Sequence, residues 1–184
     1  MSAIETLMNE HRAIESVLDA LVEYAGRLDG GTAEPAELGR FVTFLREFAD
    51  ARHHGKEEDV LFATMAEYGF PTETGPIAVM LADHEHGRGL IGVMREAAER
   101  GGTWDAAERA RIAEAAREYA ALLRNHIWKE DNILYVMAQK HLEGDAMRRV
   151  DEVCARVDRE RDAAGEGARL EELARALVTS FAKA

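Results

Sequence analysis

The sequence has few of the features that mark secreted or membrane proteins. Its 184 residues include one cysteine, Cys154, so an intrachain disulfide is excluded. No apolar run approaches the roughly 18–20 residues that a membrane-spanning helix needs. The opening decapeptide, MSAIETLMNE, has neither the basic flank nor the apolar core of a signal peptide. From these absences we expect a cytoplasmic protein.

Positive charge is also scarce. The chain has 23 Lys and Arg residues against 35 Asp and Glu residues, which gives a formal net charge of −12. A strongly acidic surface repels the phosphates of nucleic acids and the headgroups of anionic lipids. We therefore expect neither nucleic acid nor a membrane as a partner.

Proline and strand-forming patterns are rare as well. There are 3 prolines, and no segment combines strict apolar–polar alternation with the β-branched residues of a strand. Glycine and proline divide the remaining sequence, rich in Ala, Glu, Leu and Arg, into six expected helices. These helices are expected at about 2–28, 35–68, 74–100, 103–142, 144–163 and 167–182. We expect Thr103 to be the N-cap of the fourth.

Four long helices with short connections predict an all-α protein, an up-down-up-down four-helix bundle with two additional C-terminal helices. Residues 1–142 would form the bundle. Residues 143–184 would form a C-terminal helical extension that packs on the bundle or lies at an oligomer interface, and a homodimer is one such assembly.

An internal repeat connects the second and fourth expected helices. The segment HHGKEEDVLF at 53–62 aligns without a gap to HIWKEDNILY at 126–135, and both follow the pattern H-x-x-K-E-[ED]-x-x-L-[FY]. The alignment pairs His53 with His126 and Glu57 with Glu130. These two helices lie diagonally across the core of an up-down-up-down bundle, so we expect the two copies to face each other.

Each of the four long helices places a histidine on its apolar face. Successive residues advance about 100° around a helix, and this projection puts one histidine of each helix within the apolar stripe. The four are His11, His53, His84 and His126. Glu57 and Glu130 follow by four residues, so each lies one turn along the same face and can reach the same metal ion as its histidine.

A single histidine on an apolar face is more often a hydrogen-bonded core residue than a ligand. Four of them together with two glutamates need another explanation, because buried carboxylates require cations or donors. His54 lies on the flank of its stripe, and the projection does not decide whether it is a metal ligand or a core residue. His86 and His141 fall outside the cluster, and Glu58 and Asp131 are expected beside the ligands or in solvent.

Imidazole and carboxylate together are the ligand set of iron, manganese or zinc. Two glutamates on opposed helices can bridge two ions, with four or five histidines in the outer positions. Such a site leaves a coordination position open for a small molecule, which favours di-iron. A mononuclear structural zinc site needs four ligands, and the other buried groups would then be unexplained.

Residues 4–142 resemble the hemerythrin-like, or HHE cation-binding, family. The resemblance rests on EHRAIE with His11, HHGKEEDVLF with His53 and Glu57, MLADHEHGR with His84, and HIWKEDNILY with His126 and Glu130. It implies a four-helix bundle around two non-haem iron ions joined by an oxo or hydroxo bridge. Iron is thereby favoured over zinc and manganese.

Two departures from the oxygen-carrying hemerythrins change the expected role. Those proteins have two histidines one turn apart on the third helix, whereas Arg88 follows His84 by one turn here. Their last carboxylate is an aspartate at the position of Asp131, whereas the internal repeat favours Glu130. The paired H-x-x-x-E motifs are closer to the iron-centre repair and iron-sensing branches, and similarity to the iron-sensing branch implies that His54 is a further ligand.

The sequence thus predicts a di-iron protein that binds or reacts with O₂, NO or peroxide. Its role would be in sensing, iron handling or defence against oxidative or nitrosative stress, and the two departures argue against reversible O₂ carriage. Two alternatives stay open. One is a di-iron enzyme with peroxidase-, catalase- or oxidase-like activity, and the other is a metal-gated interaction module whose residues 143–184 contact a partner.

Overall fold

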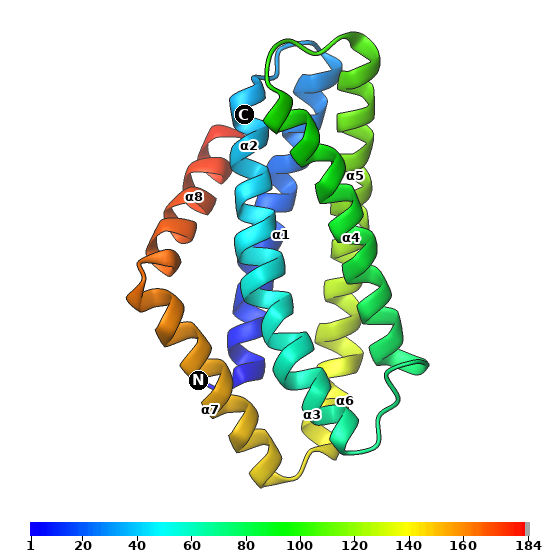
Figure 1. Cartoon of the computed structure of the whole chain (residues 1–184), viewed down its shortest axis with the longest axis vertical. Helices are drawn as coiled ribbons and strands as arrows, with labels where there is room; N and C mark the ends of the chain where they lie inside the picture. Colours follow the sequence, from blue (N-terminus) through cyan, green and yellow to red (C-terminus); the bar gives the residue numbers. More distant parts are fainter. Residues whose placement is uncertain (183–184) are drawn as a thin grey trace.

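A computed structural model of the chain describes residues 1–182. Four long antiparallel helices form an up-down-up-down bundle, and two further helices lean against one side of it (Figure 1). No strand occurs within the described residues. The predicted all-α bundle with two additional C-terminal helices is confirmed.

The first and third long helices are regular α-helices. Helix α1 spans Ala3–Asp29 and begins with a capping box, in which the Ser2 hydroxyl accepts from the Glu5 N–H and the Glu5 carboxylate accepts from the Ser2 N–H. Helix α4 spans Gly75–Arg100. Both boundaries lie within a few residues of those predicted from glycine and proline.

The second and fourth long helices contain π-helical turns. The second consists of α2 (Pro35–Phe44), η1 (Leu45–His54), η2 (Glu57–Phe62) and α3 (Ala63–Glu67). The fourth consists of α5 (Ala106–Lys129), η3 (Glu130–Leu134) and α6 (Tyr135–His141). In a π turn the N–H bonds to the carbonyl five residues back, and such turns are frequent at functional sites. The first copy of the repeated motif lies almost entirely in these turns, and the second copy contributes the segment Glu130–Leu134.

Three local predictions are wrong. Asp105, not Thr103, caps α5: its carboxylate accepts from the Glu108 N–H and the Glu108 carboxylate accepts in return from the Asp105 N–H. The 100° projection places Ile133 on the apolar stripe of the fourth helix, but Ile133 is exposed, because it lies inside η3, where the wider turn breaks the 100° count. The same projection places Met8 on the α1 stripe, but Met8 is exposed as well.

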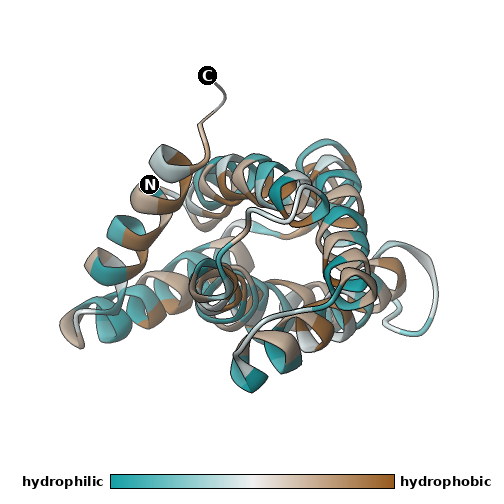
Figure 2. Cartoon of the chain, turned by 90° about the horizontal axis from the view of Figure 1, so that it is seen from above, coloured by the Kyte–Doolittle hydropathy of each residue, from teal (hydrophilic) through white to brown (hydrophobic). Residues whose placement is uncertain are grey.

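The order of the helices around the bundle places the two repeat copies on diagonal helices. Helix α1 packs on α5, α5 packs on α4, and α4 packs on α2. Seen from above, these four helices form a ring, and the C-terminal pair lies outside it (Figure 2). The expected diagonal arrangement of the second and fourth helices is therefore present.

The core divides into two apolar clusters with a polar layer between them. Along α1, Leu7 belongs to one cluster and Ile14 to the other. Along the fourth helix, Ile127 and Leu134 divide in the same way. The residues between these positions include the buried histidines and glutamates, which are thus enclosed above and below by packed apolar side chains.

The C-terminal helices pack on the bundle. Helix α7 spans Gly144–Ala163 and α8 spans Glu166–Ser180. Helix α7 contributes to one apolar cluster and α8 to the other. The Phe181 ring lies 5.3 Å from the ring of Phe41, measured between centroids. A role at an oligomer interface stays a prediction.

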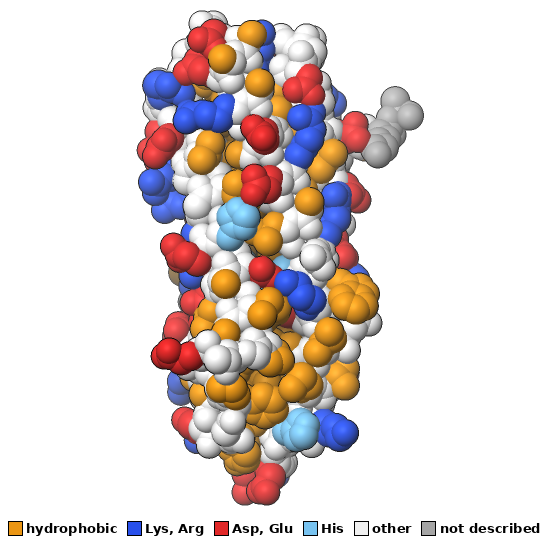
Figure 3. Space-filling view, turned by 90° about the vertical axis from the view of Figure 1, so that its right-hand side faces the viewer, with side chains coloured by type: hydrophobic (Ala, Val, Ile, Leu, Met, Phe, Trp, Pro, Cys, Tyr) orange, Lys and Arg blue, Asp and Glu red, His pale blue; other side chains and the backbone are white. Residues whose placement is uncertain are grey.

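The face turned away from the C-terminal pair carries apolar side chains, which gather over its lower half (Figure 3). The exposed large apolar residues of the chain include Val79, Trp128 and Val136. Within residues 1–182, no helix has the length and apolar character that a membrane span requires. The homodimer expected from the sequence stays a prediction.

Candidate metal centre

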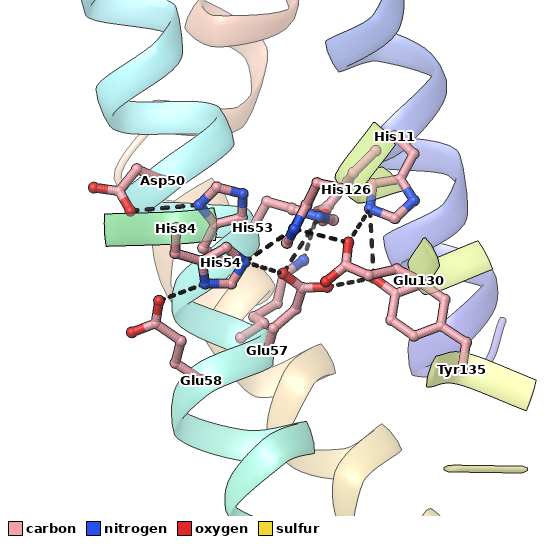
Figure 4. Close-up of polar contacts among 12 residues, drawn as sticks. His11, Asp50, His53, His54, Glu57, Glu58, His84, His126, Glu130 and Tyr135 are labelled. Atoms are coloured by element: carbon pink, nitrogen blue, oxygen red, sulfur yellow. Dashed lines mark hydrogen bonds and ion pairs between the residues drawn. The ribbon is translucent and has the colours of Figure 1, made fainter. Parts of the chain in front are cut away.

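A buried polar cluster crosses the middle of the bundle (Figure 4). It brings together all seven metal ligands predicted from the sequence: His11, His53, His54, Glu57, His84, His126 and Glu130. None of the seven is more than 4 % exposed. His86, by contrast, lies on the surface beside Glu118, and His141 is exposed. The structure therefore assembles the predicted set and leaves these two histidines out.

Each histidine of the cluster turns its Nδ1 towards a carboxylate. The pairs are His11 with Asp131 at 2.7 Å, His53 with Glu10 at 2.8 Å, His84 with Glu58 at 2.6 Å, His126 with Asp83 at 3.3 Å and His54 with Asp50 at 3.5 Å. A carboxylate that accepts from Nδ1–H fixes the tautomer in which Nε2 carries a lone pair. Metal-binding histidines are oriented in this way.

The inward Nε2 atoms meet around Glu130. Glu130 Oε2 lies 3.2 Å from Nε2 of His11 and 3.2 Å from Nε2 of His126. The Nε2 atoms of His84 and His126 lie 3.0 Å apart. These nitrogens come from three of the four long helices, which the polar layer connects at one point.

Glu57 occupies the corresponding position on the second helix. Its Oε2 lies 3.5 Å from His84 Nε2 and 3.7 Å from His53 Nε2. The other carboxylate oxygen accepts a short hydrogen bond from the Tyr135 hydroxyl. Tyr135 therefore holds Glu57 so that one oxygen stays directed towards the histidines.

The ligand atoms form two groups that share Glu57. One group is His54, Glu57, His84 and His126, and the other is His11, His53, Glu57 and Glu130. Within each group the ligand atoms lie within 4.8 Å of one another. Glu130 also reaches His126 of the first group, so both glutamates connect the two groups, as bridging carboxylates would.

The donor set fits a metal ion. Within the described residues, several buried atoms of the cluster lack a hydrogen-bond partner: Nε2 of His53, Nε2 of His54, Oε2 of Glu57 and both carboxylate oxygens of Glu130. Leaving a buried polar group unsatisfied costs about 1–3 kcal/mol, and more for a charged one. A cation would satisfy these atoms together, and a set of imidazole nitrogens and carboxylate oxygens suits iron, manganese or zinc.

The repeated motif assigns a role to its lysine. Lys56 Nζ donates to Glu10 Oε1 at 2.5 Å, and Lys129 Nζ donates to Asp83 Oδ2 at 2.5 Å. Each of these carboxylates in turn faces the histidine of the same motif copy. The lysine of H-x-x-K-E therefore fixes the group that orients the motif's own histidine.

The acidic residue after each ligand glutamate has an equivalent role. Glu58 faces His84 and Asp131 faces His11. Each motif copy therefore orients the histidine of another helix as well as its own. The expectation that Glu58 and Asp131 lie beside the ligands agrees with these contacts.

Two substitutions break the symmetry between the copies. His54 in the second helix corresponds to Ile127 in the fourth, and Phe62 corresponds to Tyr135. As a result, one group of ligand atoms has three histidines and the other has two. The Tyr135 hydroxyl lies 3.4 Å from His11 Nε2, on the side of the group with two.

The C-terminal extension also contacts this network. Lys56, which is 1 % exposed, pairs with Asp158 of α7 at 3.0 Å as well as with Glu10. Arg52 Nη2 lies 3.0 Å from the same Asp158 carboxylate. Helix α7 is thereby connected to His53 through two charged residues.

Without a metal, burial and the charge of Glu130 together shift the pKa values of His126 and Glu57. Burial opposes a charge on His126, but the Glu130 charge and the Asp83 contact outweigh burial and raise the pKa of His126 to about 9. Burial and repulsion by Glu130 raise the pKa of Glu57 well above its usual value. At neutral pH the cluster therefore holds protons on groups that a metal ion would bind.

Metal affinity is therefore expected to increase with pH. His126 must lose its proton before Nε2 can bind a cation, and its pKa near 9 means that binding at pH 7 releases this proton. Each released proton should raise the apparent affinity about tenfold per pH unit between roughly pH 7 and 9. Titration with Mn²⁺ at pH 7, 8 and 9, in buffers of different ionisation enthalpy, measures affinity and proton release together. A pH-independent affinity would contradict this assignment.

Several functional neighbours were missed from the sequence. Glu10, Asp50 and Asp83 were not singled out, although each faces a histidine. Two of them directly precede a core histidine in the chain, as Glu10 precedes His11. An acidic residue immediately before a buried histidine was thus the available signal.

One comparison with known proteins gives a match. A family model described as the hemerythrin HHE cation binding domain matches residues 2–138. The match includes every residue of the cluster and ends before α7. Neither a curated protein nor a solved structure matches the chain.

Proposed function

Because the chain belongs to the hemerythrin HHE cation-binding family, we propose that its buried cluster holds two iron ions and binds or reacts with O₂, NO or peroxide. The observation that carries this proposal is the pair of ligand groups that share Glu57. The role we infer is in sensing, iron handling or defence against oxidative or nitrosative stress.

The ligand count supports two ions over one. A structural zinc ion takes four ligands, whereas seven buried ligand residues converge here. Bound iron would supply redox chemistry and an open position for a small molecule. The group with two histidines offers fewer nitrogens than the other, which favours that side as the place where a small molecule binds.

The chain itself orients the ligand side chains and keeps bulk water away from the cluster. Carboxylates hydrogen-bond four of the five imidazole rings from outside, and the Asp50 carboxylate lies 3.5 Å from the fifth, that of His54. The apolar clusters above and below the polar layer exclude bulk water, so that electrostatic interactions inside are stronger than in solution. Tyr135 places an O–H group beside Glu57 and His11, where it can donate a proton to a bound small molecule.

Metal analysis and absorption spectra test the proposal directly. After anaerobic loading with Fe²⁺ and exposure to O₂, the chain should contain about two iron ions and show near-ultraviolet charge-transfer bands. Spectra are then compared before and after addition of O₂, NO and peroxide. Retention of less than about half an iron per chain, or of one tightly held zinc ion that iron does not replace, would overturn it.

Turnover of peroxide is a second candidate function. It is favoured by the buried Tyr135 hydroxyl, a proton donor at the side of the cluster with fewer histidines. Oxygen release and peroxide loss can be followed in the same iron-loaded samples. Steady turnover would support an enzyme, whereas a full metal content with no turnover would favour binding or sensing.

A further inference from the structure

A small hollow lined by arginine side chains lies beside the metal-binding cluster, between η1 and α4. The hollow has a volume of about 210 Å³. The residues that line it are Arg46 and Asp50 of η1 and Arg88, Ile91, Gly92 and Arg95 of α4. The space beside Gly92 is open, since a Cβ atom built there meets nothing within 4 Å. Three cationic groups thus converge on one hollow of a chain whose net charge is −12.

These arginines are only partly neutralised. Arg88 donates to Asp50 at 2.9 Å and to Glu58 at 2.7 Å, so two carboxylates already neutralise it. Arg95 has a buried Nε without a hydrogen-bond partner in the described part of the chain, and the Glu99 carboxylate stays 3.7 Å from it. Arg46 is exposed and makes no ion pair with residues 1–182. The hollow therefore offers free N–H donors from Arg46 and Arg95, whereas the Arg88 guanidinium is already paired with carboxylates.

We propose that this hollow binds a phosphate-class oxyanion, either inorganic phosphate or the phosphoryl group of a larger molecule. A guanidinium presents parallel N–H donors that match the oxygens of such an anion and form charge-assisted hydrogen bonds with it. The arginines come from two helices, so they can approach one anion from different sides. The unpartnered Arg95 N–H is a donor that a bound oxyanion would satisfy.

The hollow is linked to the metal-binding cluster through Arg88. The Arg88 guanidinium donates to Asp50 and, at 2.7 Å, to Glu58. These two carboxylates face the Nδ1 atoms of His54 and His84. An anion that binds the Arg88 guanidinium weakens its hold on both carboxylates, and the orientation and basicity of the two imidazoles change with it.

Calorimetric titration of the full chain with inorganic phosphate tests the site. The wild-type chain in a low-ionic-strength chloride buffer should bind phosphate, and Arg95→Gln and Arg46→Gln should each weaken binding at least about tenfold. Arg111→Gln is the matched control, because Arg111 is also exposed, makes no ion pair with residues 1–182 and lies outside the hollow. That control should bind phosphate as the wild type does.

A second titration, with glycerol phosphate, separates the two sources of the anion. Comparable affinity for both compounds would support a phosphoryl group of a larger ligand, and binding of inorganic phosphate alone would support the free anion. No binding by the wild type, or equal binding by the variants at positions 46 and 95, would overturn the site.

The link to the cluster has its own readout. In the iron-loaded chain, phosphate should shift the absorption bands of the wild type and of Arg111→Gln, but not those of Arg95→Gln. A shift that persists in Arg95→Gln would mean that phosphate binds the iron directly and would overturn the link. The calorimetric result on the metal-free chain does not depend on iron, so the oxyanion site and the proposed di-iron function can fail separately.

Discussion

Glu57→Gln should abolish binding of both metal ions at once, because Glu57 is the residue that the two ligand groups share. Glutamine keeps the volume of the side chain and can still accept the hydrogen bond from Tyr135. It removes the negative charge that would be divided between two cations. The metal content should therefore fall from about two ions per chain to less than one.

The metal-free form of the same variant should be more stable than the metal-free wild type. Burial and repulsion by Glu130 raise the pKa of Glu57. The wild type thus loses stability as the pH rises above the ordinary glutamate pKa of about 4.5, because the unfolded chain releases this proton while the folded chain retains it. A neutral glutamine does not have this penalty. Thermal unfolding of both metal-free chains at pH 5 and pH 8 measures the difference, which should be larger at pH 8.

Two control variants make the Glu57 result specific. Glu58→Gln removes a carboxylate that orients His84 without being a predicted ligand, so metal affinity should fall only about 10–100-fold. Glu85→Gln, at a side chain that is 80 % exposed, should leave binding unchanged. A Glu57→Gln chain that keeps a full metal content would disprove the bridging role, since neither ligand group would then depend on it.

The sequence predicted the bundle and six of the seven converging residues because two simple rules apply over most of the chain, whereas His54 was implied by the family resemblance alone. Glycine and proline end the helices, and a 100° projection shows which side chains face inward. This projection works for His11 and His84, which lie on regular α-helices. It also works for Glu57 and Glu130, because each lies only four residues beyond a histidine. It fails at Ile133, after the chain has entered the π turns of η3.

The carboxylates that orient the histidines could not be predicted by the same projection. Glu10 is rotated by about 100° from His11, which puts it at the seam between helices. Its partner is His53, on the neighbouring helix, and only the observed packing decides which neighbour faces that seam. The same holds for Asp83, which directly precedes His84 and contacts His126. Two adjacent residues of one helix thus serve two different sites: the histidine faces the core, and the carboxylate before it contacts a histidine of another helix. A projection of one helix at a time does not show this second contact.

The internal repeat also makes a matched pair of stability experiments possible. Lys56 and Lys129 occupy the same motif position, and each donates to a carboxylate that orients a histidine. Their surroundings differ, since the Lys56 side chain is 1 % exposed and that of Lys129 is 25 % exposed. Lys56 also contacts Asp158 of α7. The pair therefore compares a buried ion pair with a more solvated one in the same motif.

Lys56→Met should destabilise the chain by about 3–5 kcal/mol, because it leaves Glu10 buried without its closest cation. For a chain of this length, that loss corresponds to a melting temperature lower by roughly 6–20 °C. Lys129→Met should cost no more than about 1 kcal/mol, because solvent screens the charge of Asp83. Urea and thermal unfolding of the metal-free chains measure both changes.

A double variant separates the lost ion pair from a general packing defect at Lys56. In Lys56→Met/Glu10→Gln the buried carboxylate is also neutral, so most of the stability should return. A packing defect would persist in the double variant, and equal losses in Lys56→Met and Lys129→Met would show that burial of this lysine has no energetic consequence. Asp158→Asn should give a smaller loss of the same kind, since Lys56 loses its α7 partner while Glu10 keeps its cation and Arg52 keeps its contact with Asp162 of α7. If it also weakens metal binding, helix α7 acts on His53 through Lys56 and Glu10, as a metal-gated contact with the C-terminal helices requires.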